Sequence, residues 1–310
     1  MERAASQHGL DTTLLAMSDG GEGFVDALGG DVRHVEVHGP LGAVVSARWA
    51  MLDDATAIVE SAQAAGRALL PFPSGDDPIR ATTAGVGETI CEAIAAGARK
   101  VVVGCGGSAS TDGGVGCVEA VVGRLGVVTV PLVAACDVRV PFFDAASVFA
   151  PQKGATPDQV AYLSHRLAET ARYYLGRFGV DVEGAPGAGA AGGLAGGLIA
   201  LGASVVSGAH FVAEQRGLAV ALGGADLVIT GEGSFDDQTL EGKVVEVVLA
   251  TRPELPALIV AGRGSRSSLE ALRAQRPGPV DLVVLDAALQ ATVGTQRAIT
   301  AAVDGYLSAR

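Results

Sequence analysis

The sequence predicts an α/β protein of two α/β lobes: a Rossmann-like lobe with a parallel sheet and a second lobe with a mixed sheet, separated by a cleft. Short apolar runs alternate with helix-like stretches along most of the 310 residues. Two early runs alternate apolar and polar positions, and several later runs end in glycine loops. We assign residues 1–32 and 215–310 to the Rossmann-like lobe and residues 33–214 to the second lobe.

The early elements predict the mixed sheet. Residues 32–40 (VRHVEVHGP) and 43–61 (AVVSARWAMLDDATAIVES) have the apolar–polar alternation of half-buried antiparallel strands, with turns at Gly39-Pro40 and Asp53-Asp54. A helix is expected over 86–96, capped by Thr82 or Thr83. The buried run Lys100–Val103 then leads into a glycine loop, as in doubly wound folds.

The later elements predict one long helix and a parallel sheet. Residues 156–179 read as an amphipathic helix with Thr156 as N-cap, Pro157 at the first helical position and Gly179 after its end. Buried strands are expected within 225–233, 256–264 and 280–287, with helices within 242–252 and 298–310. This βαβαβα order is typical of a parallel sheet.

Composition excludes several classes of protein. A net charge of −12 and a pI near 4.8 argue against a nucleic-acid partner, because a phosphate backbone needs a basic face. Cysteines 91, 105, 117 and 136 lack the CxxC spacing of zinc sites. With no secretory signal at the N-terminus, we expect reduced thiols in a cytoplasmic protein. The five histidines (8, 34, 38, 165 and 210) have no metal-site spacing, so we expect structural or solvated roles for them.

One segment has the hydropathy of a membrane span. Residues 184–213 carry no Asp, Glu, Lys or Arg, and Gly189, Gly193 and Gly197 repeat at the spacing that packs transmembrane helices. The many glycines and Pro186 instead favour a buried helix packed closely on a sheet. We therefore expect no membrane partner.

Two glycine-rich segments could bind phosphate and metal. In SDGGEGF (18–24), Asp19 and Glu22 supply hard oxygen ligands for Mg²⁺; the alternative is a polar turn that starts a helix. In GCGGSASTDGGVG (104–116), the amides around Gly106, Gly107 and Ser108 could cradle phosphate, with Asp112 beside them. The alternative is a tight turn. A dinucleotide fingerprint is only loosely matched, because no acid follows at the required distance.

Two further segments combine acids with scarce lysines, since only three lysines occur in the chain. Asp137 follows an apolar run, where it could orient or deprotonate a substrate hydroxyl, and Lys153 could bind carboxylate or phosphate. Residues 230–243 hold Glu232, Asp236, Asp237 and Lys243 after a strand, where acids commonly anchor magnesium. Alternatively, Asp137 and Thr239 cap helices and the other charges are solvated.

Together these segments resemble the type I glycerate kinases of bacteria. The resemblance lies in SDGGEG (18–23), TTAGVGETICEAIAAGARKVVVGCGGSASTDGGVG (82–116), ACDVRVPF (135–142), FAPQKGAT (149–156), PGAGAAGGLAGGL (186–198) and ADLVITGEGSFDDQTLEGK (225–243), in the family order.

The resemblance implies phosphorylation of D-glycerate to 2-phosphoglycerate with ATP and Mg²⁺, in a site between two discontinuous lobes. It implies catalytic roles for Asp137, Lys153, Asp236 and Lys243. It places the cofactor at Gly106, Gly107, Ser108 and Asp112, and the metal at Asp19, Glu22 and Glu232. The expected partner is a small molecule, glycerate, and self-association into a homo-oligomer is left open.

The chain departs from the family pattern in four places. The strand and Pro-Asp-Ser-Phe-Lys-Gly-like loop that usually begin the family are absent, and the stretch between Gly116 and Asp137 is short. Val140 replaces a usual Asn, and Ser234 a common Arg. Two alternatives follow: a non-catalytic or altered-substrate relative that binds a small acid or nucleotide, and a nicotinamide-dependent oxidoreductase based on Gly104–Ala109.

Overall fold

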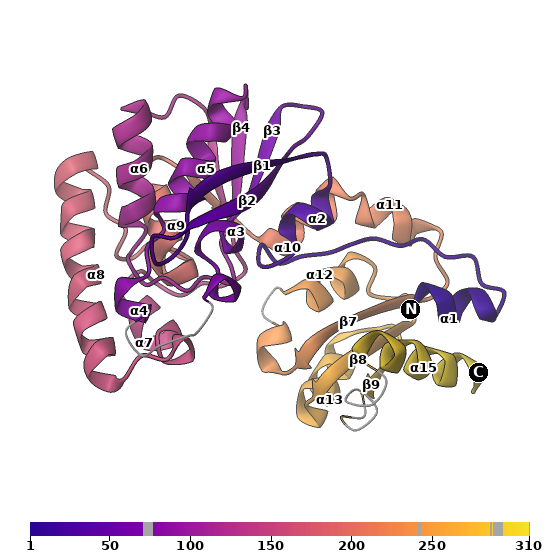
Figure 1. Ribbon diagram of the computed structural model, residues 1–310. Coiled ribbons are helices and arrows are strands. Elements are labelled where there is room, and N and C mark those ends of the chain that lie inside the picture. Colours follow the sequence, from indigo (N-terminus) through magenta and orange to yellow (C-terminus); the bar gives the residue numbers. More distant parts are fainter. Residues whose placement is uncertain (71–76, 241–242, 286, 288–293, 310) are drawn as a thin grey trace. The chain divides into compact units, whose positions relative to one another are not determined.

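The protein is described from a computed structural model, which covers residues 1–70, 77–240, 243–285, 287 and 294–309. The chain divides into two compact units, here called the larger unit (Ser18–Phe211) and the smaller unit (Met1–Met17 with Val212–Arg310). Figure 1 shows the elements of both. Residues 18–32, which were expected in the Rossmann-like lobe, fall in the larger unit, where the helix Phe24–Leu28 packs on the strand Thr56–Glu60.

The larger unit contains a six-stranded mixed sheet with strand order β1-β2-β3-β4-β5-β6. Its first pairings, β1 with β2 and β2 with β3, are antiparallel, and β3 to β6 run parallel to one another. This confirms the mixed sheet. The strands are β1 (Asp31–His38), β2 (Val44–Met51), β3 (Thr56–Glu60), β4 (Lys100–Gly104), β5 (Leu132–Ala135) and β6 (Ser204–Val206).

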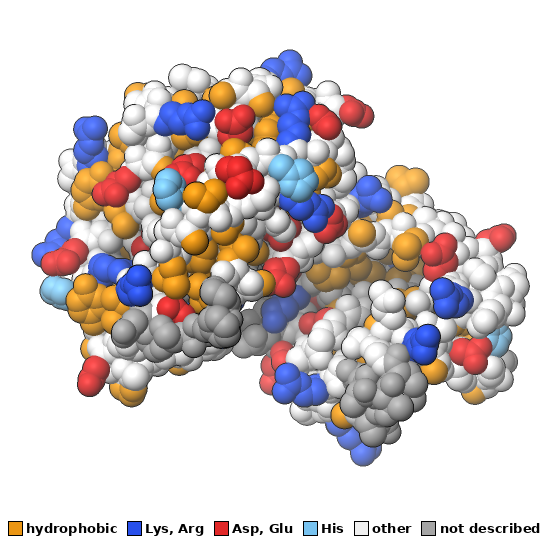
Figure 2. Space-filling model, in the orientation of Figure 1, with side chains coloured by type: hydrophobic (Ala, Val, Ile, Leu, Met, Phe, Trp, Pro, Cys, Tyr) orange, Lys and Arg blue, Asp and Glu red, His pale blue; other side chains and the backbone are white. Residues whose placement is uncertain are grey.

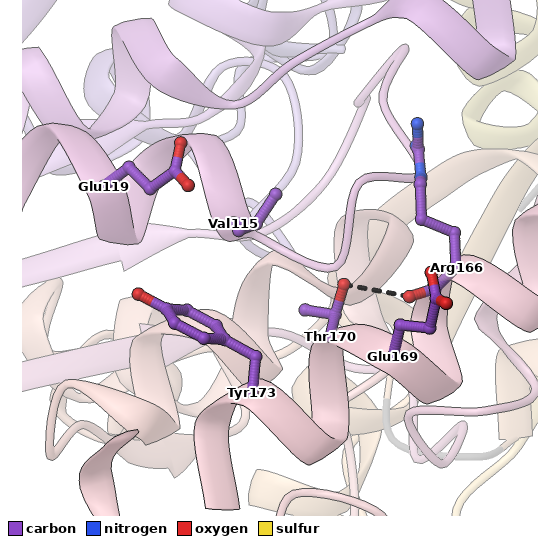
Figure 3. Close-up of a pocket in the computed structure, with 6 residues that line it drawn as sticks. All are labelled: Val115, Glu119, Arg166, Glu169, Thr170 and Tyr173. Carbon is purple, nitrogen blue, oxygen red and sulfur yellow. Dashed lines mark hydrogen bonds between the residues drawn. The ribbon is translucent and has the colours of Figure 1, made fainter. Parts of the chain in front are cut away.

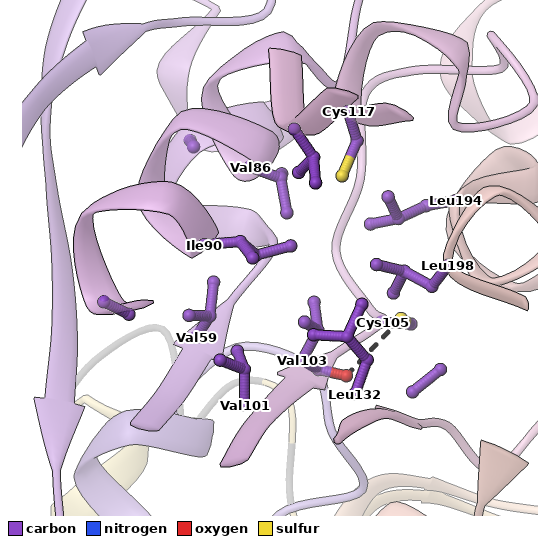
Figure 4. Packing of buried hydrophobic residues seen from close by; sticks show 14 of the residues in the cluster. Val59, Val86, Ile90, Val101, Val103, Cys105, Cys117, Leu132, Leu194 and Leu198 are labelled. Atoms are coloured by element: carbon purple, nitrogen blue, oxygen red, sulfur yellow. Dashed lines mark hydrogen bonds between the residues drawn. The ribbon is translucent and has the colours of Figure 1, made fainter. Parts of the chain in front are cut away.

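Helices cover both faces of this sheet. On one face, Val101 and Val103 of β4 pack with Ile90 of α5 and with Leu194 and other side chains of α9 (Figure 4). On the other, Phe24 of α2 and Phe211 of α10 approach to 6.2 Å between ring centres. The helices of this unit are α2 (Phe24–Leu28), α3 (Ala62–Ala65), α4 (Asp77–Arg80), α5 (Ala84–Ala95), α6 (Val115–Leu125), α7 (Ala145–Phe149), α8 (Pro157–Phe178), α9 (Ala190–Ala200) and α10 (Gly208–Gln215), which crosses into the smaller unit.

The long helix α8 has the predicted boundaries. The Thr156 hydroxyl accepts a hydrogen bond from the Gln159 amide, and the Gln159 side chain accepts one from the Thr156 amide, which completes a capping box. Gly179 ends the helix with a left-handed backbone (φ 70°). Both ends are thus fixed by local residues, which explains why the sequence alone located them.

Within the uncharged stretch at 184–213, residues 190–200 form a buried helix (α9), as predicted. In α9, all residues from Leu194 to Leu198 are buried, and no described helix is long and apolar enough to cross a membrane. The backbone of Ala191, Gly192 and Gly193 is left-handed rather than helical. A β-carbon at Gly192 would lie 2.1 Å from the Ser110 carbonyl oxygen, so glycine permits this close approach to the 104–116 loop.

The smaller unit contains the predicted parallel sheet, with strand order β7-β8-β9. The α1 and α15 helices pack on it through Ala4, Ala298 and Val303, which contact Leu258 and Val260 of β8. Its elements are α1 (Glu2–Gln7), α11 (Leu218–Gly223), β7 (Val228–Phe235), α12 (Val244–Thr251), β8 (Ala257–Gly264), α13 (Arg266–Gln275), β9 (Val280–Val284) and α15 (Thr295–Ser308).

The visible surface (Figure 2) carries charges of both signs, and the cysteines are buried. On the face shown in Figure 2, basic and acidic side chains are interspersed rather than gathered in one basic patch. All four cysteines are free and buried in the larger unit. Burial raises the pKa of each of these thiols, that of Cys136 to about 12.

Candidate active site

The candidate active site lies at the carboxyl edge of the larger sheet, where the parallel strands β3 to β6 end. Glu60 closes β3, the glycine loop begins after Gly104 of β4, Asp137 follows β5 and Ser207 follows β6. Parallel α/β sheets place ligands beyond this edge. The strand directions thus bring together segments that are far apart in the sequence.

The 18–23 turn packs directly against this edge. A β-carbon at Gly20 would lie 2.4 Å from the Ala135 carbonyl oxygen, and one at Gly208 would lie 2.2 Å from the Asp19 carbonyl oxygen. A β-carbon at Gly107 would likewise lie 3.1 Å from the Cγ of Glu22. Glycines therefore let this turn, the loop after β4 and the start of α10 meet backbone to backbone, which places Asp19 and Glu22 at the sheet edge.

The glycine loop has two adjacent amides available for a ligand. Within the described chain, the N–H groups of Gly106 and Gly107 donate no hydrogen bond, while the Gly107 carbonyl accepts one from Arg67. Gly107 has φ +65°, which favours glycine. The Ser108 hydroxyl lies 2.7 Å from the Ser110 hydroxyl and accepts from the Ser110 amide (3.0 Å). Ser108 thus shapes the loop, and the two amides are suited to an anion.

Asp112 faces the protein interior. Its carboxylate accepts hydrogen bonds from the Thr83 amide and hydroxyl (both 2.9 Å), the Gly114 amide (3.0 Å) and the Gly116 amide (3.3 Å). The residue is 4% exposed. The Thr83 hydroxyl therefore donates to Asp112 and does not cap α5. The Thr82 hydroxyl accepts a hydrogen bond from the Ala84 amide at the start of this helix. Asp112 thus joins the N-terminal ends of α5 and α6 and positions the loop between β4 and α6.

Lys153 contacts the same loop from the short 3-10 helix Pro151–Lys153. Its ammonium group donates a hydrogen bond to the Ser110 carbonyl oxygen. Burial lowers the pKa of Lys153 to about 7; the Asp112 carboxylate opposes this shift and the Arg67 guanidinium adds to it. A lysine in this setting is near its titration point at neutral pH.

Asp137 is held at the start of α10. Its Oδ1 accepts a hydrogen bond from the Ser207 hydroxyl (2.7 Å), and its Oδ2 accepts one from the Ala209 amide (3.1 Å). Burial raises the pKa of Asp137 to about 6, against the lowering effect of these hydrogen bonds, and the negative charge of Asp19 raises it further. A carboxylate with this pKa can accept a proton near neutral pH.

The remaining predicted residues lie at the carboxyl end of β7 in the smaller unit. Glu232 is within the strand, opposite Ala261 of β8, because β7 continues to Phe235 instead of ending before the acids. Asp236 accepts a hydrogen bond from the Ser234 hydroxyl (3.1 Å), and its amide donates to Thr239 (3.0 Å). Thr239 therefore orders this turn, and Lys243 occupies the N-cap position of α12.

A magnesium ion carried with a nucleotide fits the donors of the 18–23 turn. Among the described residues, no group of three or more His, Cys, Asp or Glu side chains is arranged to hold a metal ion by itself. Nucleotide-bound Mg²⁺ takes only one or two protein carboxylates and completes its shell with phosphate and water. Asp19 and Glu22 provide two carboxylates of this kind, beside the free amides of the glycine loop.

The structure adds three residues that were not expected to belong to the site. Ser207 and His210 contact each other and reach Asp137 through the serine. Arg166 of α8 donates to the carbonyl oxygens of Ile79 and Thr111, both at 2.7 Å. The sequence signal for Ser207 and His210 was a serine directly after a strand, with a histidine three residues later. Arg166 lies within the helix α8, where no sequence signal distinguished it from the other polar residues.

A pocket between α6 and α8 lies beside Arg166 but contains none of the predicted site residues. Its volume is about 220 Å³, and Figure 3 shows its lining. The lining residues are Val115, Glu119, Arg166, Glu169, Thr170 and Tyr173. We place the candidate site at the sheet edge instead, because the free loop amides and Asp137 are there.

Comparison with known proteins identifies relatives over nearly the whole chain. The model of the glycerate kinase family matches residues 1–126 and 123–298. An uncharacterised protein of Mycobacterium bovis is 42% identical over 304 residues, which cover 90% of this chain and 80% of that protein. The glycerate 2-kinase of Escherichia coli is 35% identical over 285 residues, covering 79% and 74%.

A solved structure has the same fold. It is a crystal structure of a Salmonella typhimurium LT2 protein described as a candidate glycerate kinase 2. The two structures superpose with a TM-score of 0.77 at 32% sequence identity, over 99% of this chain and 92% of the other. The similarity therefore includes both units.

Proposed function

The chain belongs to the glycerate kinase family, and we propose that it transfers the γ-phosphoryl group of ATP to the C2 hydroxyl of D-glycerate. The products are 2-phosphoglycerate and ADP. This proposal rests on one observation: the free amides of Gly106 and Gly107 and the carboxylate of Asp137 follow neighbouring parallel strands, at the same carboxyl edge of the sheet. Phosphoryl transfer depends mainly on such positioning and charge stabilisation.

Asp137 acts as the base in this proposal. It accepts the C2 hydroxyl proton as the hydroxyl oxygen bonds to the γ-phosphorus, and the bond from that phosphorus to the β,γ-bridging oxygen breaks. The pKa of Asp137, raised by burial to about 6, keeps it ionised at neutral pH yet basic enough to take the proton. The Ser207 hydroxyl and the Ala209 amide hold the carboxylate in place.

The loop and its lysine bind the nucleotide in this proposal. The amides of Gly106 and Gly107 hold phosphate oxygens, Ser108 and Asp112 keep the loop in shape, and Lys153 in its protonated form supplies a positive charge beside it. Asp19 and Glu22 would hold Mg²⁺, which neutralises phosphate charge when bound. Asp236, Lys243 and Glu232 are assigned to the same reaction from the family motif.

A coupled assay tests the proposal. Purified protein with ATP, Mg²⁺ and D-glycerate should form ADP, and ³¹P NMR of the product should show 2-phosphoglycerate. L-glycerate and a reaction without glycerate are the controls. A well-folded sample that binds glycerate or ATP by calorimetry without turnover would instead favour a non-catalytic binding protein. Formation of 3-phosphoglycerate would overturn the assignment of the hydroxyl.

A further inference from the structure

A serine and a histidine at the start of α10 form a connected chain with Asp137. The Ser207 hydroxyl oxygen lies 2.7 Å from Asp137 Oδ1 and 3.0 Å from His210 Nδ1, and it accepts the His210 backbone amide at 3.2 Å. Asp137 and Ser207 are partly buried, and His210 is exposed. The three groups therefore run from the proposed site toward solvent.

The direction of the hydrogen bonds follows from the number of protons. A serine hydroxyl has one proton and two lone pairs. When Asp137 is ionised it can only accept, so the hydroxyl proton points to Asp137 and both lone pairs face His210. His210 Nδ1 must then carry a proton, which it donates to Ser207. This arrangement satisfies each group and fixes the rotation of the hydroxyl.

We propose that Ser207 and His210 are positioning residues for the reaction, with His210 orienting the Ser207 hydroxyl so that it holds Asp137 Oδ1 and leaves Oδ2 to accept the substrate proton. This inference rests on the proposed function only in naming Asp137 as the base. A role limited to helix capping is the alternative, because Ser207 also accepts the amide of the third helical residue.

The groups around Asp137 determine the sign of the expected pH effect. The titratable groups that face it in the described structure are Asp19, the neighbouring Cys136, and His210 through Ser207. The Ser207 bond favours the ionised carboxylate, so its loss raises the pKa of Asp137 further. Ser207→Ala should therefore keep Asp137 protonated to higher pH and reduce turnover most strongly below pH 7.

The experiment combines titration and kinetics. In ¹³C NMR of the ligand-free protein, with the Asp137 signal assigned by its loss in Asp137→Asn, Ser207→Ala should raise the midpoint by about one pH unit, the size of one charge-assisted hydrogen bond. The acid limb of the kcat profile should shift with it. His210→Phe should produce a smaller shift of the Asp137 midpoint in the same direction. In His210→Asn, whose side-chain amide can replace the Nδ1 donor, the midpoint should lie within about 0.2 unit of the wild-type value.

Two control variants test whether losing any capping hydroxyl or any exposed histidine has the same effect. Thr156→Ala removes a capping hydroxyl from α8, and His165→Phe removes an exposed histidine; neither should move the Asp137 midpoint. An unchanged midpoint in Ser207→Ala, or His210→Asn behaving like His210→Phe, would overturn the inference. Because the NMR titration needs no turnover, its result is independent of whether the wild-type protein phosphorylates glycerate.

Discussion

Asp112→Ala should destabilise the larger unit strongly, because one buried carboxylate satisfies three backbone amides. The variant leaves the Thr83, Gly114 and Gly116 amides without their acceptor, while the Thr83 hydroxyl can rotate to another partner. An unsatisfied buried donor costs about 1–3 kcal/mol. Allowing for relaxation, we expect the free energy of unfolding of this unit to fall by about 3–5 kcal/mol.

Trp49 makes this measurement specific to one unit. It is the single tryptophan of the chain, is 1% exposed and lies in β2 of the larger unit. Urea titration followed by its fluorescence therefore reports unfolding of that unit alone. Asp181→Ala is the matched control, since this exposed carboxylate accepts a single amide, that of Glu183. A loss for Asp112→Ala no larger than that of the control would refute the reasoning.

Three further predictions concern the proposed site. Asp137→Asn should lower kcat at least about 100-fold with little change in the KM for ATP, since a general base contributes this much; a near-normal rate would remove Asp137 as the base. Wild type should gain stability relative to Lys153→Met as pH rises from about 7 toward 10, because the folded state binds fewer protons there than the unfolded state; a pH-independent difference in Trp49-monitored unfolding would contradict this. Lys243→Ala should reduce kcat/KM at least about tenfold through loss of a phosphate-directed charge, whereas the exposed Arg266→Ala should not; equal rates for the two would argue against Lys243.

The sequence located the elements whose ends depend on neighbouring residues. The capping box of α8 and Gly179 are local signals, and both ends of that helix were correct. The end of β7 was placed too early, because glycines usually mark a loop after a strand. Here a β-carbon at Gly231 would lie 2.2 Å from the Val260 carbonyl oxygen, so this glycine permits close strand contact within the sheet.

The site was predictable by region but not by the direction of each side chain. The positions of Asp137 and the glycine loop followed from the strand order. The orientation of Asp112 depends on Thr83, 29 residues earlier, and the role of Ser207 depends on Asp137, 70 residues earlier. A single sequence contains no sign of such distant partners, so Asp112 was expected to face the nucleotide, and the bond from Ser207 to Asp137 was not expected.

The four buried thiols allow the opening rate of the larger unit to be measured by chemical labelling. Every cysteine of the chain lies there, with its side chain inaccessible and its thiolate disfavoured. An alkylating reagent can modify them only when that unit opens, so labelling rates measured by mass spectrometry would record its opening without any engineered probe. A ligand that binds at the glycine loop next to Cys105 should slow this labelling, while the smaller unit contributes no background.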